Sequence, residues 1–184
     1  MMKVVVEVPK ELADRVNRYP KGEWKARGKE ISILGDRYYT EKHMWAKKTS
    51  EGYFKVGVTD YAQRVLWESA QANAALFEIF KTAGDEVEAG EVFGTVYGSY
   101  YANFDYVGYE AMAFDLTAPV SGRIIKVNCR VIDNPKLINI SPYEEGWIAI
   151  IEPKDPRSDL CDLIPSMKYK NILTRKERSP FRIV

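Results

Sequence analysis

Residues Ala118-Pro119-Val120-Ser121-Gly122 lead into a β-branched run at 124–127. This stretch predicts a tight turn that enters a strand, and Gly122 can supply a positive φ there without steric cost. Similar short runs, rich in aromatic or β-branched residues and nearly all bounded by turn residues, recur along the chain. They lie at 31–33, 44–46, 53–58, 76–79, 92–96 and 147–151. Many short, regularly punctuated strands predict a mostly β chain, either a small sandwich or a barrel.

The two ends of the chain carry helical patterns. A strand at 3–8 and a helix at 11–19 after Pro9 predict an N-terminal strand–helix extension over residues 1–29, followed by a main domain at 30–184. Residues 165–176 predict a terminal helix with Met167, Ile172 and Leu173 facing inward. Thr59 or Asp60 predicts a helix cap, with the helix running to about residue 66. Residues 135–138 predict one short turn, and 85–89 a charged loop.

The charge balance excludes some classes of partner. The chain has 184 residues, with 27 basic and 26 acidic side chains, so its formal net charge is +1. We therefore expect no nucleic-acid partner and no membrane partner, and no apolar run reaches membrane-spanning length. The two cysteines, Cys129 and Cys161, are not closely spaced. We read them as structural thiols of a cytoplasmic protein, with a disulfide as the alternative.

Five further segments stand in a fixed order along the chain. They are Tyr39-Thr40-Glu41-Lys42-His43-Met44-Trp45, Gly57-Val58-Thr59-Asp60-Tyr61-Ala62-Gln63, Ala118-Pro119-Val120-Ser121-Gly122, Val127-Asn128 and Ser141-Pro142-Tyr143-Glu144-Glu145-Gly146-Trp147. As an ordered set they resemble the glycine cleavage system H protein family. The resemblance implies a barrel-sandwich hybrid of the lipoyl/biotinyl type, and a non-enzymatic carrier in which one lysine bears a lipoyl group.

The attachment lysine of that family has no counterpart in this chain. Residues 82–125 contain no lysine. An ungapped alignment from Asp115 backwards places the lipoyl position at Ala111, and a gap that matches Glu110 to the family glutamate places it at Ala113. Neither alanine offers the amine that lipoyl transfer requires. We therefore expect no cofactor, and specifically no lipoyl group.

The cleft that receives the lipoyl arm in the family is also altered. By resemblance, Met44 replaces a carboxylate, Lys42 a small hydroxyl residue and Val65 a histidine, while Asp115 remains. With His43, these residues form the residual cleft. Replacing polar groups by Met and Val removes the electrostatic reason for a charged arm to dock.

The hairpin that would present the lysine is longer than in the family and rich in tyrosine. Residues 97–110 supply a candidate interaction surface, which consists of Tyr97, Tyr100, Tyr101, Phe104, Tyr106, Tyr109 and Glu110. Tyrosine gives a large contact area at low entropic cost, so this segment is a candidate recognition surface. The alternative is that the rings fold back and fill the former cleft.

Few side chains of this sequence suit catalysis or metal binding. His43 is the only histidine and its family counterpart lies beside the tryptophan, which favours a structural role; a zinc or other metal site is not expected. We expect no enzyme. The favoured hypothesis is a lipoyl-free interaction or scaffold protein whose partner is a lipoyl-handling enzyme or a multi-subunit complex. The alternatives are a carrier modified at an atypical lysine, Lys81 or Lys126, and a small-ligand binder in the remodelled cleft.

Overall fold

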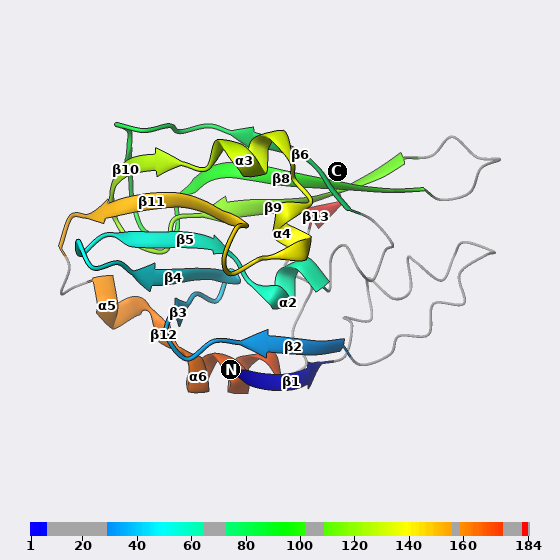
Figure 1. Cartoon of the computed structure of the whole chain (residues 1–184), viewed down its shortest axis with the longest axis horizontal. Helices are drawn as coiled ribbons and strands as arrows, with labels where there is room; N and C mark the ends of the chain where they lie inside the picture. Colours follow the sequence, from blue (N-terminus) through cyan, green and yellow to red (C-terminus); the bar gives the residue numbers. More distant parts are fainter. Residues whose placement is uncertain (7–28, 65–72, 102–108, 156–158, 175–181, 184) are drawn as a thin grey trace.

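The computed structural model describes residues 1–6, 29–64, 73–101, 109–155, 159–174 and 182–183, and strands dominate them (Figure 1). The strands are β1 (Met2–Val6), β2 (Lys29–Ile33), β3 (Tyr38–Tyr39), β4 (Met44–Lys48), β5 (Phe54–Val58), β6 (Asn73–Ile79), β7 (Glu86–Val87), β8 (Val92–Tyr101), β9 (Tyr109–Thr117), β10 (Gly122–Val127), β11 (Trp147–Pro153), β12 (Ile164–Pro165) and β13 (Arg182–Ile183). The helices are short: α2 (Asp60–Gln63), α3 (Cys129–Asp133), α4 (Leu137–Ile140), α5 (Asp159–Asp162) and α6 (Ser166–Leu173).

The strands form two main sheets and one small one. The larger sheet has the order β12-β3-β4-β5-β11-β10-β7, the second has the order β13-β9-β8-β6, and β1 pairs with β2 alone. Every pairing between these strands is antiparallel. The prediction of a mostly β, barrel-sandwich hybrid with short helices is confirmed.

Both main sheets contribute to one hydrophobic core. Phe54 and Ile151 of the larger sheet, and Phe93, Phe114 and Leu116 of the smaller one, are at most 2% exposed and belong to the same cluster of buried residues. Strand residues alternate between faces, so one apolar face of each sheet is enough to build this core. Burial of these apolar side chains is the dominant favourable term in folding.

Gly122 is required for a different reason from the one predicted. The described glycines with positive φ are Gly52, Gly84 and Gly90, and Gly122 is not among them. A Cβ added at Gly122 would lie 2.0 Å from the carbonyl oxygen of Glu152. The turn into β10 therefore needs glycine because the neighbouring strand approaches closely, and not because of an unusual backbone conformation.

Five strands were not predicted: β9 and the two-residue strands β3, β7, β12 and β13. The 85–89 segment, expected to be a charged loop, contains β7, which pairs with β10 and buries Val87 at 2% exposure. Strand β13 adds Arg182 and Ile183 to the edge of β9. Strands of two residues carry too little sequence pattern to be recognised, because alternation needs at least four residues to be visible.

The helical predictions were correct in place and partly wrong in detail. Thr59 caps α2 and accepts a hydrogen bond from the Ala62 amide at 3.3 Å, as predicted. Helix α6 begins after Pro165 and buries Leu173, but Met167 is 60% exposed. Tyr169, four residues before Leu173, takes the inward position instead and is fully buried. An i, i+4 pair shares one helix face, whereas position 167 is rotated away from it.

The N-terminal strand belongs to the body of the molecule. Strand β1 pairs with β2 from Met2 opposite Ile33 to Val6 opposite Lys29. Val4 joins the common core. The helix predicted at 11–19 lies outside the described residues, and the division at residue 29 into extension and main domain stays a prediction.

The exposure of Cys129 differs from the prediction of a structural thiol. Cys129 is a free and exposed thiol, so it is not a buried structural cysteine. Among the helices in the described part of the chain, none is long and apolar enough to cross a membrane.

Candidate functional site: the β8–β9 hairpin and the His43 turn

Strands β8 and β9 form a long antiparallel hairpin. Their register runs from Val92 opposite Thr117 to Tyr101 opposite Tyr109, with one irregularity near Gly94. Figure 1 shows the pair extending past the ends of the neighbouring strands. A hairpin that protrudes on a regular ladder holds its end at a defined place, because each added pair of residues fixes the next.

The two alanines aligned with the lipoyl position lie within this ladder. Ala111 stands opposite Ser99, and Ala113 stands opposite Tyr97. On its other edge Ala113 pairs with Arg182 of β13, and the Ala113 side chain is 1% exposed. Neither position is at the turn of the hairpin, because the ladder continues beyond both to Tyr101 and Tyr109.

Two polar contacts hold the base of the hairpin. The Thr95 hydroxyl donates to the Asp115 carboxylate at 3.0 Å, across directly opposed positions of β8 and β9. The Tyr97 hydroxyl donates to the Glu78 carboxylate on β6 at 2.9 Å. Asp115, predicted as a cleft residue, is therefore engaged in fixing the hairpin to its neighbours.

The predicted tyrosine surface is described only in part. Tyr100 and Tyr101 lie at the outer end of β8, and Tyr109 and Glu110 lie at the start of β9. Phe104 and Tyr106 fall outside the described residues. The backbone therefore places four of the candidate residues next to one another at the protruding end, in the register Tyr100 opposite Glu110 and Tyr101 opposite Tyr109.

The residual-cleft residues 42–44 form a tight turn into β4 on the other sheet. His43 has φ 59°, the one non-glycine residue of the described chain with positive φ, while Lys42 is exposed and Met44 is fully buried. Amide and carbonyl groups close the turn, with the His43 amide donating to Thr40 O at 3.0 Å. Val65 lies outside the described residues.

The contacts of His43 are those of a buried structural residue. Its Nδ1 lies 2.8 Å from the Tyr169 hydroxyl, and its ring centre lies 4.5 Å from that of Tyr61. Burial, with a smaller contribution from Lys42, lowers the pKa of His43 to about 3. The imidazole is neutral near pH 7 and is sealed from water, so it is poorly placed to exchange protons with a substrate. Tyr169 was missed by the sequence reasoning, although an aromatic residue four before Leu173 was a usable signal.

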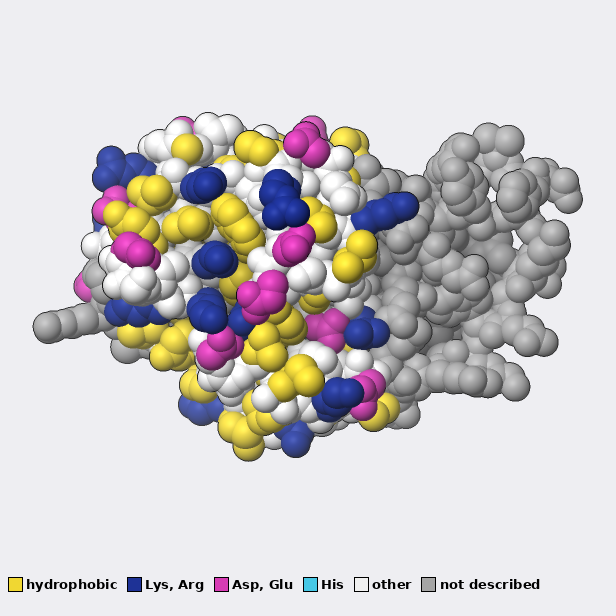
Figure 2. Space-filling view, viewed as in Figure 1, with side chains coloured by type: hydrophobic (Ala, Val, Ile, Leu, Met, Phe, Trp, Pro, Cys, Tyr) yellow, Lys and Arg dark blue, Asp and Glu magenta, His cyan; other side chains and the backbone are white. Residues whose placement is uncertain are grey.

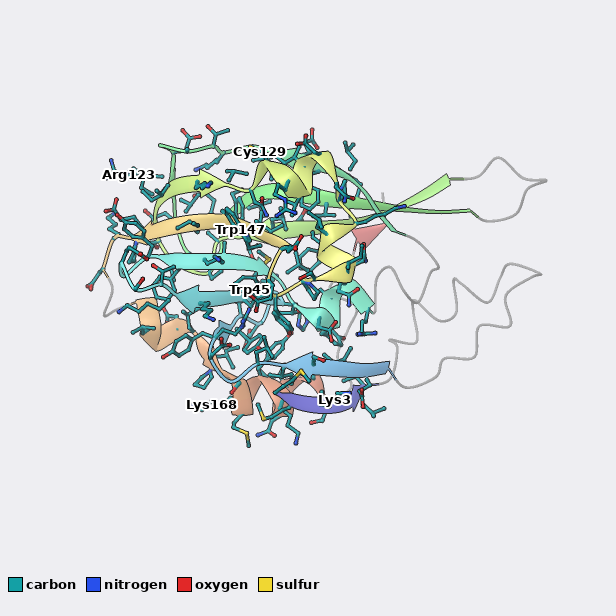
Figure 3. The ribbon with its side chains drawn as sticks, in the orientation of Figure 1. Lys3, Trp45, Arg123, Cys129, Trp147 and Lys168 are labelled. Atoms are coloured by element: carbon teal, nitrogen blue, oxygen red, sulfur yellow. The ribbon has the colours of Figure 1, made fainter. Side chains whose placement is uncertain are left out.

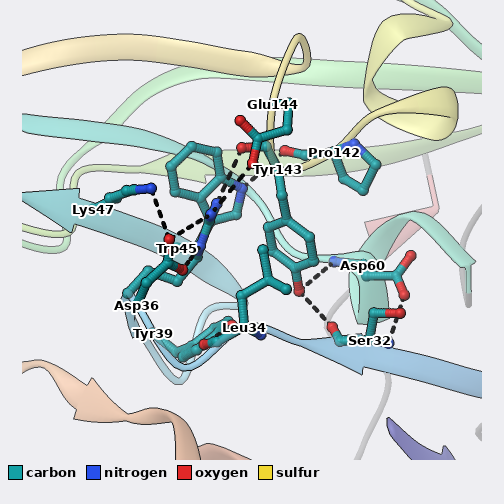
Figure 4. Close-up of polar contacts among 11 residues, drawn as sticks. Ser32, Leu34, Asp36, Tyr39, Trp45, Lys47, Asp60, Pro142, Tyr143 and Glu144 are labelled. Atoms are coloured by element: carbon teal, nitrogen blue, oxygen red, sulfur yellow. Dashed lines mark hydrogen bonds and ion pairs between the residues drawn. The ribbon is translucent and has the colours of Figure 1, made fainter. Parts of the chain in front are cut away.

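The 141–147 segment places Pro142 and Tyr143 beside Trp45 (Figure 4) and anchors a buried cation there. Arg37 lies between two rings, with its guanidinium carbon 4.8 Å from the centres of both Trp45 and Tyr143. Its Nη1 donates to Tyr143 O at 3.0 Å, and Trp45 Nε1 donates to Pro142 O at 3.0 Å. The Tyr143 hydroxyl continues the network, donating to Ser32 O at 2.7 Å. These residues fix the fold and present no reactive group.

Metal and small-molecule chemistry finds little support in the described residues. No group of three or more His, Cys, Asp or Glu side chains in those ranges is arranged to hold a metal ion. A shallow pocket of about 290 Å³ is lined by Glu86, Glu88, Arg123, Glu152 and Lys154 among others. It lies at the β7 end of the large sheet, whereas the His43 turn leads into β4 near the other end.

Comparison with known proteins identifies the scaffold. The family model for the glycine cleavage H-protein matches residues 37–176. The chain belongs to the glycine cleavage H-protein family. It is 37% identical over 141 residues to glycine cleavage system H protein 4 of Aquifex aeolicus, covering 77% of this chain and 71% of that protein. It is 35% identical over 147 residues to the H protein of Anaeromyxobacter sp. strain K, covering 80% of this chain and all of the other.

A solved H-protein structure has the same fold. The crystal structure of the H protein from Mycobacterium marinum matches with a TM-score of 0.56 and 28% identity, covering 76% of this chain and 98% of that one. Glycine cleavage H proteins are carriers and not catalysts, so this family member is not itself an enzyme.

The expectation that no cofactor belongs to this protein is wrong at the level of the family. Glycine cleavage H proteins carry a covalently attached lipoyl group, and this chain is 33–37% identical to proteins of that name. The β8–β9 hairpin nevertheless does not fit the attachment, since Ala111 and Ala113 have no amine, and Ala113 is buried and paired with β13 at the sheet edge. The missing lysine misled the prediction because absence of the usual attachment site was equated with absence of the group.

Proposed function

We propose that this H-protein family member acts as a non-catalytic component that binds a partner enzyme through its β8–β9 hairpin. The observation that carries the proposal is the ladder from Val92 to Tyr101 against Tyr109 to Thr117, which projects an aromatic-rich end from the body. The partner class is an enzyme that handles lipoyl carriers, or a multi-subunit complex. The place of action is the cytoplasm, where the exposed Cys129 would stay a thiol.

The chemistry of the hairpin suits protein recognition. Tyrosine combines an apolar ring with a hydrogen-bonding tip and loses few rotamers on binding. A paired hairpin is already ordered before it meets a partner, so less conformational entropy is lost on association. The contacts at its base, Thr95 with Asp115 and Tyr97 with Glu78, hold it in one direction.

A binding measurement tests this role. We would measure the affinity of the purified protein for the lipoate ligase and the glycine decarboxylase of its own host. The double variant Tyr100→Ser/Tyr101→Ser should weaken the interaction at least about tenfold, since aromatic anchors contribute most of the energy of such interfaces. The matched control is Tyr53→Ser/Phe80→Ser, which removes two aromatic rings elsewhere. Equal loss in both variants, or binding to neither enzyme, would overturn the proposal.

Family membership favours a second candidate function, a lipoyl carrier modified outside the hairpin. The lysines that flank the lysine-free segment differ in availability. Lys81 Nζ donates to Glu86 O at 2.7 Å and is paired with Glu91. Lys126 is exposed on β10 and contacts the face of Trp147. Lys126 is therefore the better attachment candidate on accessibility.

Mass spectrometry separates the two functions. The intact mass is measured after expression with lipoate and a lipoate ligase, and any adduct is mapped to a lysine. An adduct lost in Lys126→Arg but kept in Lys81→Arg would establish the second candidate. An unmodified protein that still binds a partner enzyme through the hairpin would establish the first.

A further inference from the structure

A second surface lies on the larger sheet, away from the hairpin. The strand registers align Lys47 with Lys55, Lys55 with Ile150, and Ile150 with Lys126, so four neighbouring strands place these residues in one row. Directly opposed residues of a sheet share a face, so the row lies on one side. Figure 2 shows basic side chains set among hydrophobic ones, with acidic side chains between some of them, on this face of the molecule.

Trp147 lies beside this row, and its ring makes cation–π contacts with two of the lysines. The Lys55 Nζ is 5.6 Å from the centre of the Trp147 ring, and the Lys126 Nζ is 6.0 Å from it. The two ammonium groups therefore lie close to the same indole ring. Trp147 and Ile150 are both half-buried, so each leaves apolar area in contact with water.

Within the described ranges, carboxylates of the protein do not pair with every lysine of this row. Lys47 is paired with Asp36 at 2.7 Å. In the described ranges, neither Lys55 nor Lys126 forms a salt bridge. The ammonium group of each lies over the Trp147 ring in a cation–π contact. Like charges in directly opposed positions, such as Lys47 and Lys55, destabilise a sheet. A local excess of positive charge on a chain of net charge +1 marks this face as complementary to an acidic partner.

We propose that the Lys55–Trp147–Lys126 face binds an acidic segment of a partner protein. Carboxylates of the segment would pair with the two ammonium groups, while an apolar side chain between them would cover Trp147 and Ile150. Tryptophan is enriched among residues that dominate interface energy, and an ammonium group over its ring is already positioned for a carboxylate. A nucleic acid fits less well, because two unpaired lysines would release few counterions. The proposal does not depend on the hairpin, which belongs to the other sheet.

The test uses a defined acidic probe on the full chain. The probe is a blocked peptide of sequence Glu-Glu-Leu-Glu-Glu, added to isotope-labelled protein whose intact mass shows no adduct. We expect shifts of the Trp147 indole signal and of the amide signals of Lys55, Ile150 and Lys126. The Gln-Gln-Leu-Gln-Gln peptide should give none of them. The double variant Lys55→Gln/Lys126→Gln should weaken binding of the acidic peptide about tenfold.

A charge-matched variant makes the result specific. Lys3 of β1 and Lys168 of α6 lie at the lower edge of the view in Figure 3, on the other side of Trp45 from Trp147. The variant Lys3→Gln/Lys168→Gln removes the same charge and should leave the affinity within about twofold. Equal weakening in both double variants would show a general charge effect and overturn the proposal. Binding of the glutamine peptide, or self-association abolished by Lys55→Gln/Lys126→Gln, would overturn it too, the latter because the occupant would be a second copy.

Discussion

The hydroxyl of Tyr169 in α6 lies 2.8 Å from Nδ1 of His43, joining the C-terminal helix to the turn that begins β4. The same hydroxyl lies 3.3 Å from Thr59 Oγ1, the cap of α2. The Tyr169 ring stacks on Tyr39, with centres 4.3 Å apart and planes within 5°. One buried side chain therefore connects α6 to β3, to the turn before β4 and to the cap of α2, all at least 110 residues earlier in the chain.

Removing the Tyr169 hydroxyl should destabilise the protein without altering its packing. Tyr169→Phe keeps the stack on Tyr39 but leaves the buried His43 Nδ1 without this partner, at a cost of about 1–2 kcal/mol in the free energy of unfolding. Tyr169→Leu, which also loses the ring, should cost about 3 kcal/mol. Urea unfolding of both variants checks the order. Equal stability of Tyr169→Phe and the parent protein would contradict it.

Stability should fall as the solution is acidified because of His43. Its pKa is about 3 in the folded protein and 6.5 without the fold. Between these values the unfolded chain binds a proton that the folded chain does not. The contribution is therefore complete above pH 6.5 and is lost as pH falls towards 3, with a slope of up to about 1.4 kcal/mol per pH unit.

Denaturant unfolding from roughly pH 4.5 to 6, inside the His43 window, measures that slope, and unfolding at roughly pH 7.5 gives the plateau above it. The control is His43→Asn, because asparagine tolerates positive φ and does not titrate. In this variant, the unfolding free energy should change less steeply with pH than in the parent protein, by the amount that corresponds to about one bound proton. The same slope in both would show that other groups control the acid sensitivity.

Two glycine substitutions should differ sharply in effect. At Gly122 an added Cβ would meet Glu152 O at 2.0 Å, whereas at Gly35 it would meet nothing within 4 Å. Gly122→Ala forces two strand backbones apart and should cost at least about 2 kcal/mol. Gly35→Ala should be neutral or slightly stabilising. Thermal unfolding of the two variants gives the comparison, and similar midpoints would refute the close-approach explanation.

The charge state of Asp36 should report on Arg37. The pKa of Asp36 is lowered to about 2. The hydrogen bond from Arg37 is the largest cause, the hydrogen bond from Lys47 is a smaller one, and burial acts in the opposite direction. Arg37→Gln should raise that pKa towards 3.8, and Lys47→Gln should raise it less. Carboxyl NMR titration of the two variants measures both values. A larger rise in Lys47→Gln would reverse the assignment.

Much of the fold could be predicted because its signals are local. The runs at 53–58 and 92–96 alternate or cluster apolar residues as strands do, and Thr59 is a recognisable helix cap. Strands β3, β7, β12 and β13 were missed because two residues show no period, and β9 because its alanines and acidic residues do not resemble a β-branched run. Of the residues predicted to face inward on α6, Met167, Ile172 and Leu173, Leu173 is buried but Met167 is exposed and Tyr169 is buried instead, because apolarity alone does not reveal which helix face meets the core.

The candidate site was predictable in composition but not in geometry. The absence of lysine from residues 82–125 and the aromatic character of 97–110 are properties of the sequence. The pairing of Ala113 with β13 and the lysine row beside Trp147 depend on which strands become neighbours. Those neighbours are separated by tens of residues along the chain, and pairing between them has no local signature.

The sequence by itself determined the strand-rich scaffold, its family and the lack of an amine in the hairpin, because periodicity, ordered motifs and residue identity are all local properties. Only the tertiary structure decided why Gly122 must be glycine, where His43 is buried, and which cations share a surface. These depend on backbone approach and on removal of side chains from water, and both arise when distant segments pack together.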